Sequence, residues 1–165
     1  MVTTPSPTTA EVRKAGGRPE SEVLEFAVDR PLAADFLTHV QNFTPEEAAF
    51  AFLRRLRSID GVPVAVEDAY MPMTLYPGIG DLSFKNASLY ETIATNWGIV
   101  PTWTDALFEP IAATSELARL LKVKKSSPLL AVWRVTLTGT DQLVECVKSV
   151  YRGDGFMLNV GRYRL

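Results

Sequence analysis

The stretch RRLRSIDGVPVAVEDAYMP, from Arg54 to Pro72, decides the fold. Two apolar segments flank the pair Asp60-Gly61, and an Asp-Gly pair in this setting is among the strongest local signals for a β-hairpin. Arginines end the first segment, and Glu67 lies on the second. Because buried charges are costly unless they are paired or used, this hairpin is where we look first for a functional site.

The spacing of the charges predicts which side chains share a face. Arg55 and Arg57 are separated by one residue, so a strand points both to the same side. A turn with an even number of residues would set Arg54 opposite Glu67, and a turn with an odd number would set Arg55 there. Two guanidinium groups on one face suit a phosphate or carboxylate. The alternative is a solvated face with weak cross-strand ion pairs, which the residues alone slightly favour.

Size and composition indicate one soluble globular domain. The chain has 165 residues, of which 47% are hydrophobic and 22% are charged, and these values are ordinary for such domains. The net charge of -2 argues against binding of nucleic acid by this chain alone. The single Cys146 excludes an intramolecular disulfide and fits a cytoplasmic protein. No apolar run approaches the ~18 residues of a membrane span.

Hydrophobic periodicity and capping signals predict the order of elements. We expect a Thr- and Pro-rich linker or arm at residues 1–20 and a domain at 21–165. Strands are predicted at 21–28, at 49–58, after Asp60-Gly61, at 101–113, on both sides of a turn at 139–141, and after Asp154-Gly155. Helices are predicted within 29–42, 86–99 and 114–123. A capping box at 44–47 would instead make the segment before 58 helical. The predicted class is α+β with a largely antiparallel sheet of about six strands and flanking helices.

Two further segments carry candidate binding residues. Ser88 is placed to begin a helix, and the free amides of a helix start form a ready anion site, although capping is the commoner role of such a serine. In the late hairpin, Glu145, Ser149 and Tyr151 share a face with Val147. A carboxylate among hydroxyls suits a polar ligand, but an edge strand facing water would look the same.

Signals for enzymatic or metal chemistry are weak. His39 and Cys146 are each the only residue of their kind, and His39 lies off the apolar stripe of its helix, which favours a solvated side chain. The segment with Gly78 and Gly80 lacks the third glycine of a phosphate loop and indicates a turn. We therefore predict neither a metal site nor a cofactor.

An ordered set of blocks resembles the UTRA domain, the C-terminal effector-sensing domain of HutC-type regulators in the GntR superfamily. The resemblance covers about Thr8 to Phe156, and its blocks are RLRSIDGVPVAVEDAYMP, SLYETI, WGI, AATSELARLLKV, PLLAVWR and VECVKSVYRGDGF. It implies a chorismate-lyase-like fold, usually in a homodimer, that follows a DNA-binding winged helix. That winged helix is missing from this sequence, so DNA would be bound only through a separate N-terminal domain.

The resemblance also implies a ligand and its contacts. The effectors of the family are small metabolites, often a phosphorylated sugar or a carboxylate. By position in the motifs, Arg55 and Arg57 match the arginines that hold the anionic group, and Ser88 matches a serine that joins them. Three more residues match positions around the rest of the ligand, namely Glu67, Glu145 and Tyr151. The match favours the register in which Arg55 faces Glu67.

The sequence departs from the family at its start. A Ser-Phe-Ser/Thr-Glu stretch often feeds the anion site, and the nearest counterpart here is TTAE, Thr8 to Glu11. Thr8 could supply a hydroxyl in its place, but the departure puts a phosphorylated sugar in question.

Two other functions fit the same residues. An enzyme of the chorismate lyase type also uses arginine and glutamate around a carboxylated ligand, although the regulator-type blocks argue against it. A dimerisation module with a degenerate pocket is the second alternative.

Overall fold

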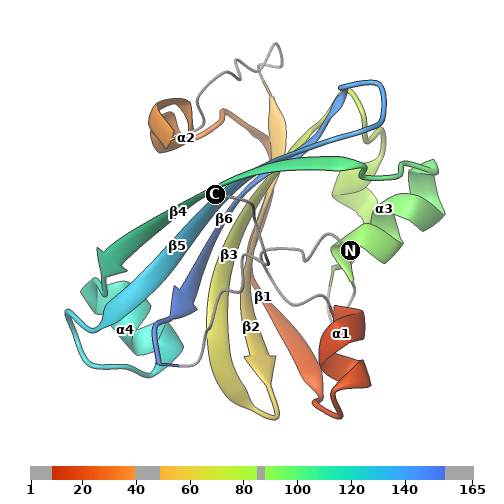
Figure 1. Cartoon of the computed structure of the whole chain (residues 1–165). Helices are drawn as coiled ribbons and strands as arrows, with labels where there is room; N and C mark the ends of the chain where they lie inside the picture. The colour runs from red at the N-terminus through yellow and green to blue at the C-terminus, as the bar shows by residue number, and fades with distance from the viewer. Residues whose placement is uncertain (1–8, 40–48, 85–87, 155–165) are drawn as a thin grey trace, which may run out of the picture.

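A six-stranded antiparallel sheet forms the centre of the protein, as the computed structural model shows for residues 9–39, 49–84 and 88–154 (Figure 1). Its order is β1-β2-β3-β6-β5-β4, and every neighbouring pair is antiparallel. The strands are β1 Pro19–Arg30, β2 Phe50–Ile59, β3 Val62–Pro72, β4 Trp103–Ala112, β5 Pro128–Leu137 and β6 Leu143–Arg152. The predicted α+β class is thus confirmed. The pairing of β3 with β6 joins the half formed by β1, β2 and β3 to the half formed by β6, β5 and β4.

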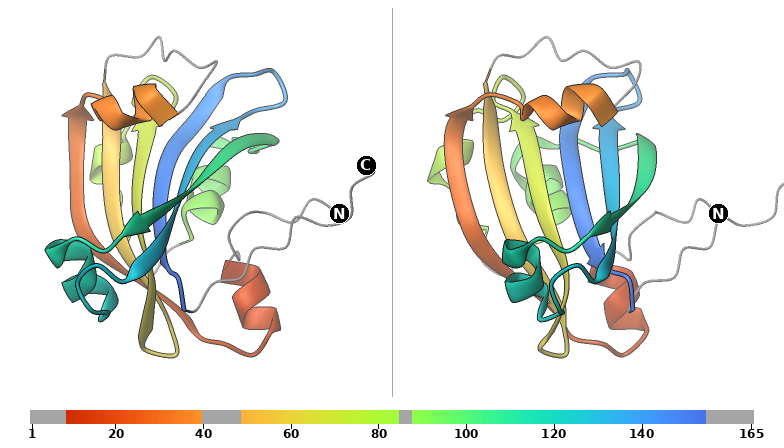
Figure 2. Two further views of the ribbon diagram at one scale, coloured as in Figure 1. Left: turned by 60° about the vertical axis from the view of Figure 1, so that its left-hand side comes forward. Right: turned by 90° about the vertical axis from the view of Figure 1, so that its left-hand side faces the viewer.

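Short helices lie on both faces of the sheet. They are α1 Thr9–Lys14, α2 Ala34–His39, α3 Leu89–Trp97 and α4 Ser115–Leu121, with a 3-10 turn, η1, at Ile79–Asp81. α1 and α3 lie on one side of the sheet and α2 and α4 on the other (Figures 1 and 2). We call these sides the α3 face and the α4 face.

Local signals explain where the longer helices begin and end. The Ser88 hydroxyl accepts a hydrogen bond from the amide of Glu91, and Gly98 ends α3 with a φ of 66°. Glycine tolerates this left-handed backbone because it has no Cβ. Thr114 caps α4 through the amide of Leu117. Both helices were predicted from these capping residues.

Several boundaries differ from the sequence-based expectations. β1 begins at Pro19, and α1 lies within the segment expected to be an arm. The Gly78-Gly80 segment forms η1, in agreement with a turn. The segment beginning at Phe50 is a strand, as predicted. The capping box at 44–47 and the strand predicted after Asp154-Gly155 lie outside the described residues.

A β-bulge sets the register of the hairpin between β2 and β3. Asp60 and Gly61 form a two-residue turn with φ values of 51° and 77°, as a type I′ turn requires. Ile59 pairs with Val62, but beyond a register shift Arg57 pairs with Ala65. The turn therefore has an even number of residues. The extra residue Val64 on β3 nevertheless produces the pairing that was predicted for a turn with an odd number of residues.

The bulge places Arg55 opposite Glu67 and Arg54 opposite Asp68. The predicted pairing of Arg55 with Glu67 is confirmed, but the predicted reason was wrong. Turn length alone would have set Arg54 against Glu67, because a shift of one residue moves every side chain to the other face.

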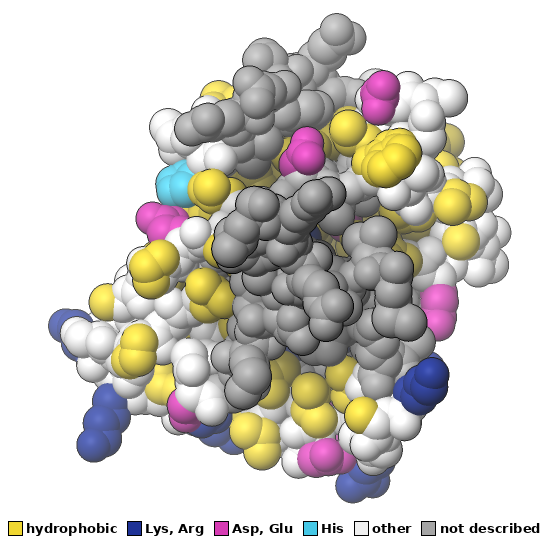
Figure 3. All heavy atoms as spheres, viewed as in Figure 1, with side chains coloured by type: hydrophobic (Ala, Val, Ile, Leu, Met, Phe, Trp, Pro, Cys, Tyr) yellow, Lys and Arg dark blue, Asp and Glu magenta, His cyan; other side chains and the backbone are white. Residues whose placement is uncertain are grey.

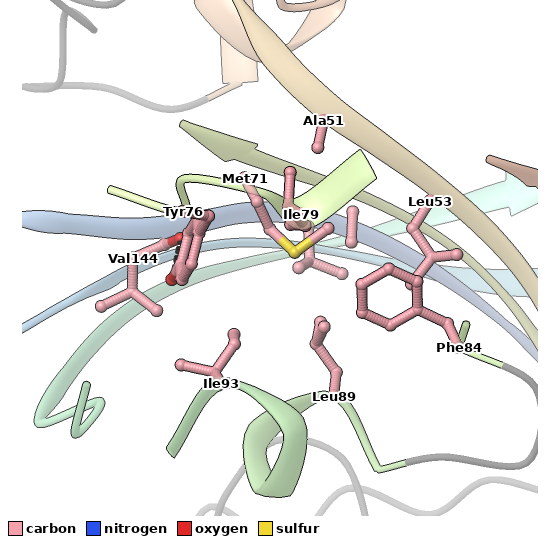
Figure 4. Close-up of a cluster of buried hydrophobic side chains, with 11 residues drawn as sticks. Ala51, Leu53, Met71, Tyr76, Ile79, Phe84, Leu89, Ile93 and Val144 are labelled. Carbon is pink, nitrogen blue, oxygen red and sulfur yellow. Dashed lines mark hydrogen bonds between the residues drawn. The ribbon is translucent and has the colours of Figure 1, made fainter. Parts of the chain in front are cut away.

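An apolar cluster joins α3 to the upper part of its face (Figure 4). Leu89 and Ile93 of α3 contact a buried set that includes Met71 and Tyr76. The Tyr76 hydroxyl donates a hydrogen bond to the carbonyl of Val144 over 2.9 Å. Burial of such side chains stabilises the fold by roughly 1.5–3 kcal/mol each, so this cluster fixes α3 against the sheet.

The α4 face has two apolar clusters separated by charged residues. α4 packs Leu121 against Val66 and Val150, and α2 packs Phe36 against Phe50. Between them, Arg54 forms ion pairs with Asp68 at 3.3 Å and Glu116 at 3.1 Å. The charges of this face thus pair with one another, although Arg54 Nε and Asp68 Oδ1 make no hydrogen bond.

We predict that Ile93→Ala lowers the free energy of unfolding by about 2–5 kcal/mol, because it opens a cavity in a site with no solvent exposure. Val100→Ala is the matched control, since Val100 is 68% exposed and should change stability by at most ~0.5 kcal/mol. Urea denaturation of the two variants measures the difference. Equal effects would show that α3 is not held by this cluster.

Candidate functional site

A buried ion-pair triad lies in the middle of the α3 face. Arg55 Nη2 donates to Glu67 Oε2 over 3.0 Å, and Arg57 Nη1 donates to the same oxygen over 3.2 Å. Arg55 and Glu67 are each 5% exposed. The structure therefore brings together three of the predicted site residues, and the solvated sheet face considered as the alternative is wrong.

β6 contributes the second carboxylate. Ser149 lies opposite Glu67 and Tyr151 opposite Ala65 in the β3–β6 ladder, so both share the α3 face with Glu145. All three are buried, with Glu145 1% exposed. β6 runs between β3 and β5, which excludes the edge-strand explanation of its polar side chains.

Two residues that the sequence analysis did not single out complete the cluster. Arg134 on β5 donates from Nη2 to the hydroxyl of Ser149 over 3.3 Å. Tyr90 in the first turn of α3 donates its hydroxyl proton to Glu145 Oε1 over 2.5 Å. An arginine inside the apolar run of β5 was a usable signal for the first residue. Tyr90 gave no signal of its own, because its partner is distant in sequence.

Ser88 has a capping role in the structure. Its hydroxyl accepts from the Glu91 amide at 3.5 Å, and α3 reaches the cluster through Tyr90 two residues later. A contact of Ser88 with a ligand stays a prediction. Thr8 lies outside the described residues.

Polar atoms without a hydrogen-bond partner mark where a ligand could bind. On the α3 face, Arg134 Nε, Glu145 Oε2 and Ser21 Oγ are buried and have no such partner among the described residues, and on the α4 face the same holds for Arg54 Nε and Asp68 Oδ1. Ser21 pairs with Arg57 across β1 and β2. Buried polar groups in native proteins are nearly always satisfied, so the three atoms of the α3 face call for partners that the described residues do not provide.

A hollow opens at the lower end of the same face. Arg57, Glu67 and Tyr151 line it together with Val12 of α1. The bulge residue Val64 and its neighbour Ala65 form part of its wall. Strands β2, β3 and β6 and helix α1 thus border one concave surface.

The pKa values of the two carboxyl groups are shifted in opposite directions. Burial raises the pKa of Glu67, but Arg55, Arg57 and Arg134 outweigh burial and hold the pKa below its ordinary value. Burial also raises the pKa of Glu145, and there Arg134 and the Tyr90 hydroxyl do not offset it. Glu67 is therefore held as the anion, whereas burial shifts the pKa of Glu145 in the opposite direction.

Other possible sites find little support. The described residues contain no group of three His, Cys, Asp or Glu side chains that could hold a metal ion, and none of their helices is long and apolar enough to cross a bilayer. His39 is not solvated as expected, because its ring stacks on Trp133 at 4.0 Å and its Nε2 lies 3.3 Å from Glu109.

The surface in Figure 3 carries no continuous basic stripe among its described residues. Its Lys and Arg side chains lie apart from one another near the edges of the view.

Comparison with known proteins places this arrangement in a family. The UTRA domain family matches residues 14–157. The chain is 32% identical over 104 residues to the HTH-type transcriptional repressor NagR of Bacillus subtilis, covering 63% of this chain and 42% of that protein. It is 31% identical over 110 residues to the mannosyl-D-glycerate transport/metabolism system repressor MngR of Escherichia coli, covering 67% and 44%. The chain thus spans less than half the length of these curated relatives.

Solved structures share the fold. The effector domain of PhnF from Mycobacterium smegmatis has a TM-score of 0.81 at 24% identity, with 94% of each chain covered. The ligand-binding domain of a GntR-family regulator from Bordetella bronchiseptica has a TM-score of 0.75 at 26% identity, with 89% of this chain and 90% of that chain covered. The chain therefore belongs to the UTRA domain family, the effector-binding domains of GntR-type transcriptional regulators, as the ordered sequence blocks predicted.

Proposed function

We propose that this domain binds a small anionic metabolite on its α3 face and thereby controls DNA binding by a HutC-type regulator. The observation that carries the proposal is the convergence of three arginine side chains on one face. Arg55, Arg57 and Arg134 all act on the carboxylate of Glu67, and Arg134 and Arg55 also act on Glu145. Arginines gathered in this way suit a phosphate or carboxylate, which accepts charge-assisted hydrogen bonds from them.

The chemistry of the cluster supports different contacts for the two ends of such a ligand. Arginine forks donate paired, charge-assisted hydrogen bonds to phosphate or carboxylate oxygens, so the anionic group would lie at Arg55 and Arg57. The unpartnered atoms of Arg134 and Glu145 offer one donor and one polar oxygen to the rest of the molecule. Hydroxyl groups on the ligand would satisfy both. Tyr151 and Ser88 are further proposed contacts.

The regulatory role of the whole protein follows by analogy with the relatives, which are named transcriptional repressors. We propose that a winged-helix domain reads DNA, that two copies form a homodimer, and that the protein acts in the cytoplasm. A ligand could shift the dimer between two arrangements only by as much as its affinities for them differ.

We also propose that the domain senses its ligand without converting it. Incubation of the protein with chorismate should release no 4-hydroxybenzoate above the rate without protein. Absorbance or chromatography would detect the product. Clear turnover would instead support a chorismate-lyase-like enzyme.

Substitution of the more exposed arginine tests the anion site. In Arg57→Ala, Glu67 keeps its bond to Arg55, so the fold should survive. We expect the affinity for inorganic sulfate or phosphate to fall by about tenfold or more, because a charge-assisted contact is lost. For the wild type, anion at about a hundred times its dissociation constant should stabilise the fold by roughly 2.7 kcal/mol. Thermal unfolding with added anion measures both effects.

Arg54→Ala is the matched control for Arg57→Ala. Arg54 lies on the same strand but points to the α4 face, where it pairs with Asp68. Its removal should leave anion binding unchanged. If both variants lose binding equally, or if neither anion stabilises the wild type or a Glu67→Gln variant, the proposed site is wrong.

The raised pKa of Glu145 predicts how stability depends on pH. The folded state binds this proton more tightly than the unfolded state, so the contribution of Glu145 to stability is full below its ordinary pKa of 4.5 and is lost as pH rises through the folded pKa. Glu145→Gln cannot titrate, and its amide oxygen can still accept from Tyr90. The variant should therefore gain stability relative to the wild type as pH rises through this window.

Urea denaturation at a series of pH values measures that difference. Glu22→Gln, on an exposed position of β1, controls for the change in net charge. A stability difference between Glu145→Gln and the wild type that stays constant with pH would contradict the prediction.

A further inference from the structure

Glu67 occupies the position that a bound anion would take. Both guanidinium groups donate to one oxygen, Oε2, at 3.0 Å from Arg55 and 3.2 Å from Arg57. A ligand oxygen held by the same two forks would need the same donors. We propose that Glu67 is an internal counter-anion that a ligand must displace from Arg55 and Arg57. Glu67 would then limit the affinity for the anion and cause protons to be taken up when the anion binds. This inference rests on the proposed function.

Charged and titratable groups approach Glu67 from every packed element. β2 supplies Arg55 and Arg57, and β5 supplies Arg134. β6 places Ser149 directly opposite Glu67 and adds Glu145, which Tyr90 of α3 contacts. The three arginines hold Glu67 as an anion in the free protein, so a second anion bound to them would meet a like charge at short range.

Competition with Glu67 would lower the apparent affinity. The arginine pair is available to a ligand only in the fraction of molecules in which Glu67 has released it, and the observed dissociation constant rises in proportion. Removal of the carboxylate charge would remove this competitor from the pair. An uncharged isostere at this position should therefore tighten anion binding.

Displacement of Glu67 would also couple binding to proton uptake. In the free protein the arginines outweigh burial and lower the pKa of Glu67. An anion on Arg55 and Arg57 would neutralise them and leave burial to raise that pKa, so the complex would hold more protons than the free protein. By linkage, affinity for an anion of fixed charge increases as pH falls, by up to about tenfold per pH unit for one proton.

Calorimetric titration of the full chain with sulfate tests the inference, because sulfate keeps its charge between about pH 5 and about pH 8, where the linkage is measured. Glu67→Gln should bind sulfate at least about tenfold more tightly than the wild type near the upper end of this range, since a like charge has been removed. Its affinity should also depend less on pH than that of the wild type.

Asp68→Asn is the matched control. Asp68 is the next residue on β3, pairs with Arg54 over 3.3 Å and lies on the opposite face. The substitution changes the net charge equally and should keep the affinity and the pH dependence of the wild type.

Three outcomes separate this inference from the proposed function. If the wild type binds sulfate, Arg57→Ala weakens binding and Glu67→Gln does not tighten it, only the internal counter-anion is overturned. If neither the wild type nor Glu67→Gln binds sulfate, both proposals are overturned. Binding by Glu67→Gln alone would support the counter-anion.

A second measurement covers the case in which Glu67→Gln does not fold. Wild-type titrations in two buffers with different ionisation enthalpies count the protons taken up with sulfate. Uptake supports the displacement of Glu67, and its absence overturns it.

Discussion

The cost of burying arginine on a sheet is the constraint on which the rest of the site depends. Arg55 is almost fully buried, and an isolated guanidinium there would be strongly destabilising. Glu67 on the neighbouring strand offsets that cost, and it bonds Arg57 as well. One carboxylate oxygen thus holds two cations on the α3 face. The same contacts fix the two guanidinium groups side by side.

Much of the architecture could be predicted from local signals. The Asp60-Gly61 turn, the serine and threonine caps of α3 and α4, and the strand alternation each depend on neighbouring residues, and each was found in the sequence. The bulge at Val64 was not found. A single extra residue in a strand gives no recognisable sequence pattern. It nevertheless decides which arginine faces Glu67.

The polar cluster was predictable only in part, because it is assembled from strands far apart in sequence. Motif resemblance selected Arg55, Arg57, Glu67, Glu145 and Tyr151, and the structure gathers them on one face. Arg134 and Tyr90 were missed because their importance depends on partners, Ser149 and Glu145, that become neighbours only through the order of the sheet. The central position of β6 in the sheet could not be predicted either, because the alternation of side chains along a strand does not distinguish a central strand from an edge strand.

The pairing of β3 with β6 has a consequence for synthesis of the chain. Ala65 lies against Tyr151 in this ladder, so the hollow closes only when nearly the whole domain has left the ribosome. Pairings between such distant segments are slow to form, because much chain entropy is lost before their contacts are gained. An emerging polypeptide therefore has no completed hollow, and effector binding has to wait for the finished fold.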